Sequence, residues 1–425
     1  MAKTYESYKD SGSTWIGQIP SGWELGNFRY YGEFTKGKLP SSTNVEAKGL
    51  PIIGASEMLG KECRTFTEET NVPLCKPDDI LILWDGANAG IISSHHTGVV
   101  SSTAVKYSCL NPDVNKNYLF YLLKSVEPFF KEEVNGTTIP HMNMKYINEV
   151  PLLIPSSKEQ QSIASFLNTK CGEIDSLISL QEEMISELQA YKQSVITEAV
   201  TKGLDPNAKM NCCASREKND ACISSSETQP AIERKFKDSG VEWIGEIPEG
   251  WSMVKMQYLA NLQSGHNLTN EQITDEGLYP VFGGNGIRGF YHEYSLDGDY
   301  VLIGRQGALC GNINYAHGKF WPTEHAVVCH PKVKYNYIWF GEMLRAMNLG
   351  QYSLSAAQPG LSVERIKQLK LPVPPLSEQQ SIATYLDAKT SQIDSLISLK
   401  QQKIDELKSY KKSIIYEYVT GKKRV

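Results

Sequence analysis

The chain repeats itself once from end to end. Residues 174–180 and 393–399 are the same seven letters, IDSLISL, and 24 of 42 positions are identical when 159–200 is aligned with 378–419. A second matched pair lies upstream, where 8–23 shares 11 of 16 positions with 236–251. Between these matched segments the two halves diverge. The pattern predicts two similar supports that carry two different heads.

The register of the repeat gives the expected domain boundaries. Trp15 matches Trp243, and from Pro140 and Pro359 onward the halves match at a shorter, constant spacing, so the length difference lies inside the variable segments. We therefore predict a first head over 1–154, a first long helix over 155–203, a polar linker over 204–235, a second head over 236–373 and a second long helix over 374–425.

Each variable segment predicts a compact α+β domain. Short β-type runs are separated by Gly, Asn and Asp turns, and one helix-like stretch follows them in each head. Gly86-Ala87 matches Gly307-Ala308, which indicates that the two heads share a fold despite dissimilar sequences. The expected strands are Ile80–Trp84, Val99–Tyr107, Tyr300–Ile303 and Ala326–Cys329, and the expected helices are 117–131 and 335–347.

The matched segments after the heads predict two long amphipathic helices. Each has the spacing of a capping box at its start, Ser157 with Gln160 and Ser377 with Gln380. A long helix cannot bury its apolar face alone, and the nearest partner is its own copy, so we predict an antiparallel coiled coil. The residues predicted to pair are Ile174, Leu177, Ile178, Ile185, Leu188, Tyr191 and Val195, with Ile393, Leu396, Ile397, Ile404, Leu407, Tyr410 and Ile414.

Charge and composition limit the functional classes. The net charge is -5, and neither head is basic: 41–150 carries 9 Lys+Arg against 13 Asp+Glu, and 253–371 carries 10 against 9. A nucleic-acid binder of this kind must use local basic loops or a partner that neutralises phosphates. The absence of a long apolar stretch or signal peptide, and nine irregularly spaced cysteines, predict a cytoplasmic protein without a membrane partner.

Catalytic and metal signatures are incomplete. Residues 284–289 fit a dinucleotide-binding glycine pattern, but strand-like sequence follows where a helix is needed, so we predict a turn. Leu39 follows Gly37-Lys38 where a phosphate loop needs a hydroxyl. Cys212, Cys213 and Cys222 lack a fourth ligand, and the Cys and His residues at 310, 325, 329 and 330 fit packing better than zinc. We predict no catalytic residue, metal or cofactor on this chain.

The whole pattern resembles the specificity subunit of type I restriction-modification systems. The motifs that carry the resemblance cover nearly all of the chain: KDSG-x-x-WIG-x-IP-x-GW at 9–23 and 237–251, EQQSIA at 159–164 and 378–383, YPVFGGNG at 279–286 and GRQGALCG at 304–311. The resemblance implies that each head is a target recognition domain reading one half of a split double-stranded DNA sequence. It also implies that the helices form a spacer that docks methyltransferase subunits.

The resemblance also implies partners and their cofactors. A duplicated support offers two near-equivalent surfaces, so two copies of the methyltransferase subunit are expected. Restriction subunits with translocase and nuclease functions complete the expected complex. S-adenosylmethionine is expected on the methyltransferase, and ATP and magnesium on the restriction subunit. The helix length is expected to set the unread gap between half-sites, which lie about one turn of DNA apart, roughly 34–36 Å.

Contact residues are predicted from the chemistry of base edges, which calls for forked donors and amides in turns, with an aromatic ring as a further contact. The candidates are Asn285, Arg288, Tyr291, Arg305, Gln306, Lys319 and Gln358 in the second head, and Lys38, Asn88, Thr137, Thr138, His141 and Asn143 in the first. Two other interpretations stay open. One is a modular binding protein whose helices serve assembly and whose heads bind protein or carbohydrate. The other is an enzyme with a diverged nucleotide site at 284–289.

Overall fold

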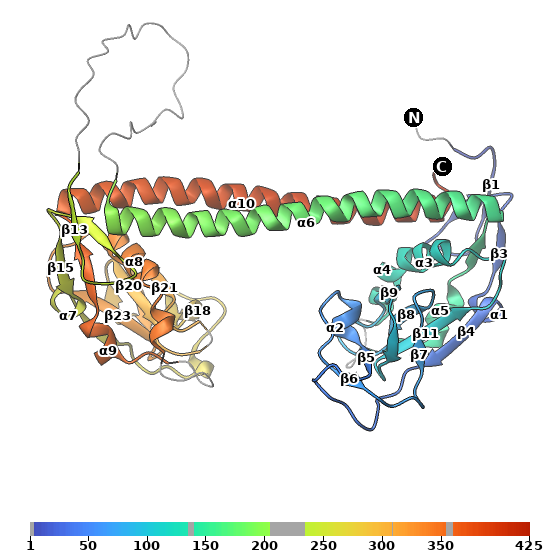
Figure 1. Cartoon of the computed structure of the whole chain (residues 1–425), viewed down its shortest axis with the longest axis horizontal. Coiled ribbons are helices and arrows are strands. Elements are labelled where there is room, and N and C mark those ends of the chain that lie inside the picture. Colours follow the sequence, from blue (N-terminus) through green and yellow to red (C-terminus); the bar gives the residue numbers. More distant parts are fainter. Residues whose placement is uncertain (1–3, 135–139, 205–233, 308, 354–359) are drawn as a thin grey trace, which may run out of the picture. The chain divides into compact units, whose positions relative to one another are not determined.

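The duplicated sequence folds into two compact units. A computed structural model describes residues 4–134, 140–204, 234–307, 309–353 and 360–425. Unit 1 comprises Met1–Glu183 and Lys400–Val425, and unit 2 comprises Met184–Leu399. Each unit holds one head and a part of each long helix (Figure 1). The predicted linker 204–235 and its three cysteines fall almost entirely outside the described residues.

Unit 1 contains a small support and a head with two four-stranded sheets. The support is the hairpin of β1 (Tyr8–Asp10) and β2 (Gln18–Pro20), and β3 (Glu24–Gly26) paired with β12 (Leu152–Ile154). One head sheet has the order β4 (Gly32–Lys36), β11 (Ala104–Cys109), β8 (Ile80–Leu83) and β9 (Ile92–Ser93); the other has the order β6 (Phe66–Thr67), β5 (Leu50–Ile53), β10 (Gly98–Val100) and β7 (Leu74–Cys75). The helices are α1 (Phe28–Tyr31), α2 (Ala55–Met58), α3 (Lys116–Ser125), α4 (Glu127–Val134) and α5 (Met144–Glu149).

Unit 2 has the same strand order in every sheet. Its support is the hairpin of β13 (Phe236–Asp238) and β14 (Glu246–Pro248), and β15 (Ser252–Lys255) paired with β24 (Lys370–Val373). Its head sheets are β16 (Ala260–Ser264), β23 (Ala326–Pro331), β20 (Tyr300–Gly304) and β21 (Ile313–Ala316), and β18 (Gly286–Tyr291), β17 (Tyr279–Gly283), β22 (Lys319–Pro322) and β19 (Leu296–Asp297). The helices are α7 (Met256–Leu259), α8 (Tyr337–Ala346) and α9 (Val363–Gln368), with single turns at η1 (Asn270–Gln272) and η2 (Leu349–Tyr352). The shared topology confirms that the heads have one α+β fold.

The central strands form because their apolar runs are buried on both faces. All four residues of β8 are buried, as are Val301 to Gly304 of β20. The predicted strands are present, although the run over 99–107 is two strands, β10 and β11, which belong to different sheets. The glycine-rich segment 284–289 is the turn and start of the β17–β18 hairpin, with Gly283 opposite Gly286. The prediction of a turn there is confirmed.

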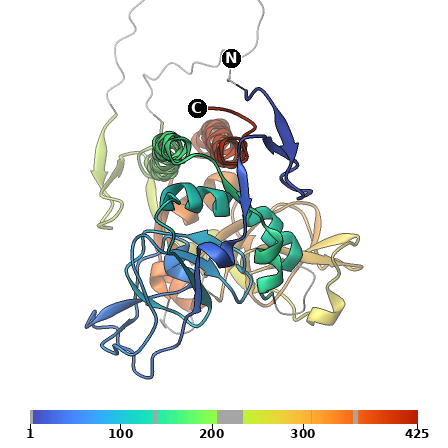
Figure 2. The ribbon, with the colours of Figure 1, turned by 90° about the vertical axis from the view of Figure 1, so that its right-hand side faces the viewer.

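The two long helices pair in antiparallel fashion. Helix α6 spans Ser157–Lys202 and α10 spans Leu376–Val419, and they lie side by side in Figures 1 and 2. In unit 1 the early part of α6, at Ile174, shares a core with the late part of α10, at Leu407 and Ile414. In unit 2 the late part of α6, at Val195, shares a core with the early part of α10, at Ile382. The buried and half-buried positions follow a heptad pattern, as expected for a coiled coil.

Four residues predicted to pair the helices lie outside this seam. Leu177 and Tyr191 are 48% and 50% exposed, and Leu396 and Tyr410 are 47% and 56% exposed. Their place in the pairing prediction is wrong, because they precede the buried heptad positions by one residue and therefore lie on the flank of the helix. The remaining predicted pairing residues are buried or half-buried.

An equivalent ion pair joins the helices in each unit. Lys192 Nζ lies 2.7 Å from Asp394 in unit 2, and Lys411 Nζ lies 2.7 Å from Asp175 in unit 1. The alignment of the two long helices matches Asp175 with Asp394 and Lys192 with Lys411. The same contact is therefore made twice, as a duplicated helix folding onto its own copy requires.

Each head is anchored to the start of a long helix by the same hydrogen bonds. In unit 1 the buried Gln160 side chain donates to Pro155 O at 2.9 Å and accepts from the Asn115 backbone N–H at 2.8 Å. In unit 2 Gln379 makes the corresponding bonds to Pro374 O and from Asn336 N–H, at 3.0 and 2.8 Å. A capping box would require the side chains of Gln160 and Gln380 to accept from a backbone N–H at the helix start. The predicted capping boxes are wrong, because Gln160 accepts from Asn115 in the head and Gln380 accepts from the Asn336 side chain.

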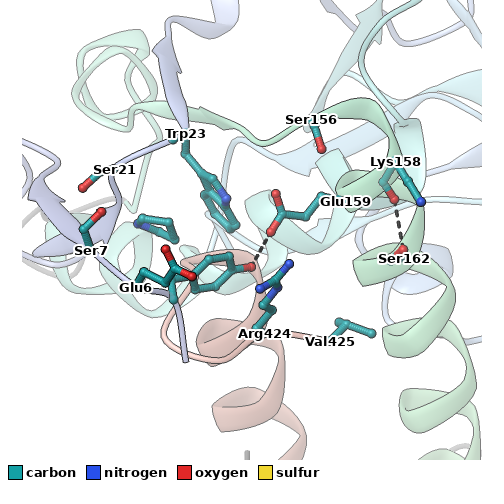
Figure 3. Close-up of a pocket in the computed structure, with 13 residues that line it drawn as sticks. Glu6, Ser7, Ser21, Trp23, Ser156, Lys158, Glu159, Ser162, Arg424 and Val425 are labelled. Carbon is teal, nitrogen blue, oxygen red and sulfur yellow. Dashed lines mark hydrogen bonds between the residues drawn. The ribbon is translucent and has the colours of Figure 1, made fainter. Parts of the chain in front are cut away.

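Residues that flank the support hairpins also contact the helix starts. In unit 1 the Tyr5 hydroxyl donates to Glu159 at 2.5 Å, and the Tyr5 ring lies 5.8 Å from the buried Trp23 ring and 5.7 Å from the Arg424 guanidinium. Figure 3 shows Trp23, Glu159 and Arg424 around the same pocket. Burial, and the bond to Glu159, raise the pKa of Tyr5, so the hydroxyl remains a donor. In unit 2 Trp251 Nε1 donates to the equivalent carboxylate, Glu378, at 2.8 Å. These contacts belong to the support and involve no head residue.

Among the residues that the structure describes, no helix combines the length and the hydropathy that crossing a membrane would require.

Candidate nucleic-acid interface

The end of the central strand is built by the same backbone in both heads. Strand β8 is followed by Trp84 and Asp85, and β20 is followed by Arg305 and Gln306; we call these four the strand-end residues. The Trp84 and Arg305 N–H groups donate to the carbonyls of Thr103 and His325, each at 2.8 Å. Their carbonyls accept from the N–H groups of Met142 and Leu361, at 2.8 and 2.9 Å. The two strand ends are therefore structurally equivalent.

A glycine turn completes each strand end. Gly86 and Gly307 have φ values of 95° and 94°, a conformation that L side chains rarely adopt. Their carbonyls accept from Ala89 and Cys310 at 2.9 and 3.0 Å, which closes both turns in the same way. The turn begins the loop that leads from β8 to its partner β9 in one head and from β20 to its partner β21 in the other. This explains why Gly86 and Gly307 are shared between otherwise dissimilar heads.

The first head carries a charged cluster at its strand end. Lys36, the last residue of β4, donates to Asp85 Oδ2 at 2.7 Å, and His141 Nδ1 donates to Asp85 Oδ1. Lys36 Nζ also lies 5.6 Å from the centre of the Trp84 ring. Partial burial acts to raise the pKa of Asp85, but hydrogen bonds from Lys36 and His141, and their charges, outweigh it and lower that pKa. Asp85 is therefore an ionised acceptor between two donors.

The second head carries amides and an arginine at the equivalent place. Arg305 Nη1 donates to Ser264 Oγ at 3.2 Å, and Ser264 ends β16 as Lys36 ends β4. Gln306 is exposed. In the adjacent hairpin turn, Asn285 accepts from Asn312 Nδ2 at 2.6 Å. This surface offers both donors and acceptors, whereas the first head presents a carboxylate between Lys36 and His141.

The other predicted contact residues lie in different places and have different hydrogen-bond partners. Lys38 and Asn88 are exposed near the first strand end, and exposed Asn143 caps α5 by accepting from Lys145 N–H at 2.9 Å. Arg288 is exposed and donates to Asn270 at 2.8 Å. Lys319 is the first residue of β22, and Pro322 is the last. The Lys319 Nζ lies 4.6 Å from the centre of the Tyr294 ring. Thr137, Thr138 and Gln358 lie outside the described residues.

Tyr291 does not fit the role predicted for it. It is 9% exposed and packs with Leu268, Val281 and Trp321 in a small core behind the β17–β18 hairpin. The alternation of side chains along β18 turns this ring inward, because Arg288 and Tyr291 lie an odd number of residues apart. A DNA contact by Tyr291 is therefore wrong.

Sequence reasoning missed Asp85, Lys36 and Asn312. Asp85 directly precedes Gly86 as Gln306 directly precedes Gly307, so the local match already placed it opposite a candidate. Lys36 and Asn312 are brought to the strand ends only by strand pairing and loop packing. Among the described residues, no group of three or more His, Cys, Asp or Glu side chains has an arrangement that fits a metal ion.

Comparison with known proteins gives a single family. The model of the type I restriction modification DNA specificity domain matches the chain twice, over 20–190 and 248–409. The EcoprrI specificity subunit of Escherichia coli is 43% identical over 39% of this chain and 40% of its own length. The MjaVIII specificity subunit of Methanocaldococcus jannaschii is 26% identical over 96% of this chain and 94% of its own length.

A solved structure supports the same fold. A chain from a study of complex assembly and conformational transition in a type I restriction-modification system superposes with a TM-score of 0.65. The match covers 94% of this chain and 98% of that chain at 15% sequence identity. At this identity the likeness concerns the fold alone, which combines two α+β heads with paired long helices.

Proposed function

The chain belongs to the family of type I restriction-modification DNA specificity proteins, and from this premise we propose that it is the DNA-recognition subunit of such a complex. One observation carries the proposal most directly. Both heads hold their strand-end residues with the same backbone bonds, yet these residues are Trp84 and Asp85 in one head and Arg305 and Gln306 in the other. A backbone kept constant under unlike side chains, among them the polar Asp85 and Gln306, suits two readers of different sequences.

We propose that each head reads one half of a bipartite double-stranded DNA target. The anchors at Gln160 and Gln379 support this idea, because they fix each head to the start of a long helix through buried hydrogen bonds. A head held in this way has a fixed position relative to the start of its long helix. The length of the helices then sets the number of base pairs left unread between the half-sites.

We propose further that the flanks of the helix pair dock two methyltransferase subunits. Leu177, Leu180 and Tyr410 are exposed in unit 1, and their repeat equivalents Leu396, Leu399 and Tyr191 are exposed in unit 2. Exposed apolar side chains at equivalent places in two units suit two copies of one partner. Restriction subunits would join the same complex, which we place in the cytoplasm. S-adenosylmethionine is assigned to the methyltransferase, ATP and magnesium to the restriction subunits, and no cofactor or catalytic role to this chain.

The docking flank has a direct test. Leu180→Glu places a charge on it and is expected to weaken binding of one methyltransferase copy by roughly thirtyfold or more, as loss of an interface hot spot does. Leu399→Glu should remove the other copy, and the double variant both. Ser179→Glu, an exposed neighbour on the other flank, is the control. Mass measurement of the purified complex gives the number of copies, and two copies on Leu180→Glu contradict the assignment.

The DNA function is tested by the salt dependence of binding. The complex of this chain with its methyltransferase should bind duplex DNA with an affinity that falls steeply with salt, since phosphate contacts release counterions. Methylated adenines mapped in genomic DNA should then define a bipartite target. A modular protein with heads for carbohydrate or protein would give neither result, so salt-independent or absent DNA binding would favour that alternative.

A further inference from the structure

We infer that Asp85 and Gln306 are equivalent base-reading residues, with Asp85 selecting cytosine in one half-site and Gln306 selecting adenine in the other. The inference rests on the function proposed above and deepens it, because it gives each head a base. Asp85 was not among the contact residues expected from sequence.

The placement of the two side chains is set by the same bonds. Asp85 follows Trp84 and Gln306 follows Arg305, and the backbone N–H and C=O of Trp84 and Arg305 both bond to other segments of the head. Each also precedes a glycine with φ near 95°. Asp85 forms an isolated bridge with His141, and Gln306 forms one with Gly360. His141 and Gly360 each directly follow the matched residues Pro140 and Pro359, so even the segment opposite is the same one. The side chains therefore leave equivalent points of the two heads.

Both residues are presented by rigid backbone. The preceding strand residues Leu83 and Gly304 are buried, and so are Met142 and Leu361 in the opposite segment. The Asp85 side chain is 35% exposed, and Gln306 is exposed. Trp84, by contrast, is 8% exposed and packs inward. Positioned side chains at the edge of a packed core can discriminate bases, because little conformational freedom is lost on binding.

The chemistry of Asp85 selects a base that offers a donor. An ionised carboxylate accepts hydrogen bonds and donates none, and each oxygen has two lone pairs, so bonds from Lys36 and His141 leave acceptor capacity. In the major groove cytosine presents its amino group, whereas adenine presents an amino group beside the N7 acceptor, which repels a carboxylate, and guanine and thymine present acceptors. Lys36 also places positive charge beside the carboxylate, which reduces its repulsion by phosphates. Asp85 is therefore suited to cytosine.

The chemistry of Gln306 selects a different base. Its amide has one acceptor and two donor hydrogens, the pattern that pairs with the adenine amino group and N7. Arg305 precedes it, and the Asn285–Asn312 pair is on the same head. The second head thus combines an amide with a cation that can contact phosphate or guanine. A single equivalent position accounts for two base preferences.

The test exchanges the two chemistries. The full complex is allowed to select from duplexes in which both half-sites are randomised. Asp85→Asn should change one position of one half-site from cytosine toward adenine, by about tenfold or more in relative affinity. Gln306→Glu should change one position of the other half-site from adenine toward cytosine by a similar factor. Each variant's unaffected half-site is an internal control.

Asp78→Asn provides a matched control in the first head. Asp78 pairs with Lys116 at 2.9 Å and precedes β8, at the opposite end of the strand from Asp85. Asp78→Asn removes the same charge as Asp85→Asn, but from an exposed ion pair, and should leave the base preference in both half-sites unchanged. Thermal unfolding of each variant identifies any loss of folded protein, and Gln306→Glu tests the inference in the second head even where Asp85→Asn weakens the first.

The outcomes separate this inference from the proposed function. If the unaltered complex shows no sequence preference, the proposed function itself fails. If the unaltered complex selects a bipartite target and both folded variants select the same target, only the assignment of Asp85 and Gln306 is overturned. Preferences that change in both half-sites at once would also overturn it, because each residue is assigned to one head.

Discussion

The anchors and the strand ends of the two heads have diverged in opposite ways. At the anchors, Asn115 with Gln160 and Asn336 with Gln379 keep the same side chains and the same bonds. At the strand ends only the backbone bonds are kept, and the side chains differ in charge, size and donor pattern. Positions that hold a head to its support are thus constrained by buried polar contacts. Positions that face outward on a constant backbone are free to change specificity without changing the fold.

The largest expected effect comes from lengthening the support while keeping the heads. Four residues inserted after Gln181 and after Lys400 add one turn to both helices, roughly 6 Å. The methylated target should gain one to two unread base pairs, and affinity for the original target should fall roughly 10²- to 10⁴-fold, because both half-sites are no longer engaged together. Mapping of methylated sites gives the new spacer. Retained binding with an unchanged spacer would contradict the proposal that helix length sets the spacer. As a control, insertion in α6 alone should only destabilise the pairing of the two helices.

Removal of an anchor should lower stability without changing specificity. Gln160 is 1% exposed, and Gln160→Ala leaves Asn115 N–H and Pro155 C=O without this partner. We expect a loss of about 2–4 kcal/mol in the free energy of unfolding, measured by denaturant titration. Gln161→Ala removes an exposed bond to Asn115 and should cost less than about 1 kcal/mol. Equal losses for the two variants would show that burial of the anchor is unimportant.

Alteration of a strand-end residue should weaken DNA binding without lowering stability. Arg305→Ala should leave thermal stability nearly unchanged and weaken binding to the target duplex by about 1–3 kcal/mol, as loss of a base or phosphate contact does. Lys332→Ala removes the same charge just after β23, at the end of that strand away from Arg305, and is the control. Fluorescence anisotropy with the mapped target measures both. Unchanged affinity and unchanged base preference for Arg305→Ala remove it from the interface.

The smallest effect is expected where the repeat is most exact and the contact is exposed. Double-mutant cycles for Lys192 with Asp394 and for Lys411 with Asp175 should each give about 0.5 kcal/mol, reduced by added salt. The two values should agree, because the lysine side chains are 25% and 28% exposed and the aspartates 57% and 56%. A coupling present in only one unit would mean that the two helix contacts are not equivalent in solution.

Much of the architecture could be predicted from the chain itself. Duplication predicted two like units, and apolar periodicity predicted long helices that pair with their own copies. Periodicity did not distinguish the seam from the flank, so Leu177 and Tyr410 were assigned to the pairing face. A capping-box spacing at Ser157 and Gln160 was likewise ambiguous, because a glutamine in the first turn bonds to whichever partner the fold brings near, and here that partner is Asn115.

Sequence alone thus determined the repeat, the α+β heads, the antiparallel helix pairing and the family, because these depend on local periodicity and on long identical segments. Tertiary structure alone decided which polar residues meet. Asp85 and His141 are 56 residues apart, and Lys36 is 49 residues from Asp85, so no local pattern links them. Their cluster exists because β4 and β8 flank the same strand, β11, and because the segment at Met142 bonds to Trp84. The physical reason is that strand pairing joins residues by register in the sheet, irrespective of their distance along the chain.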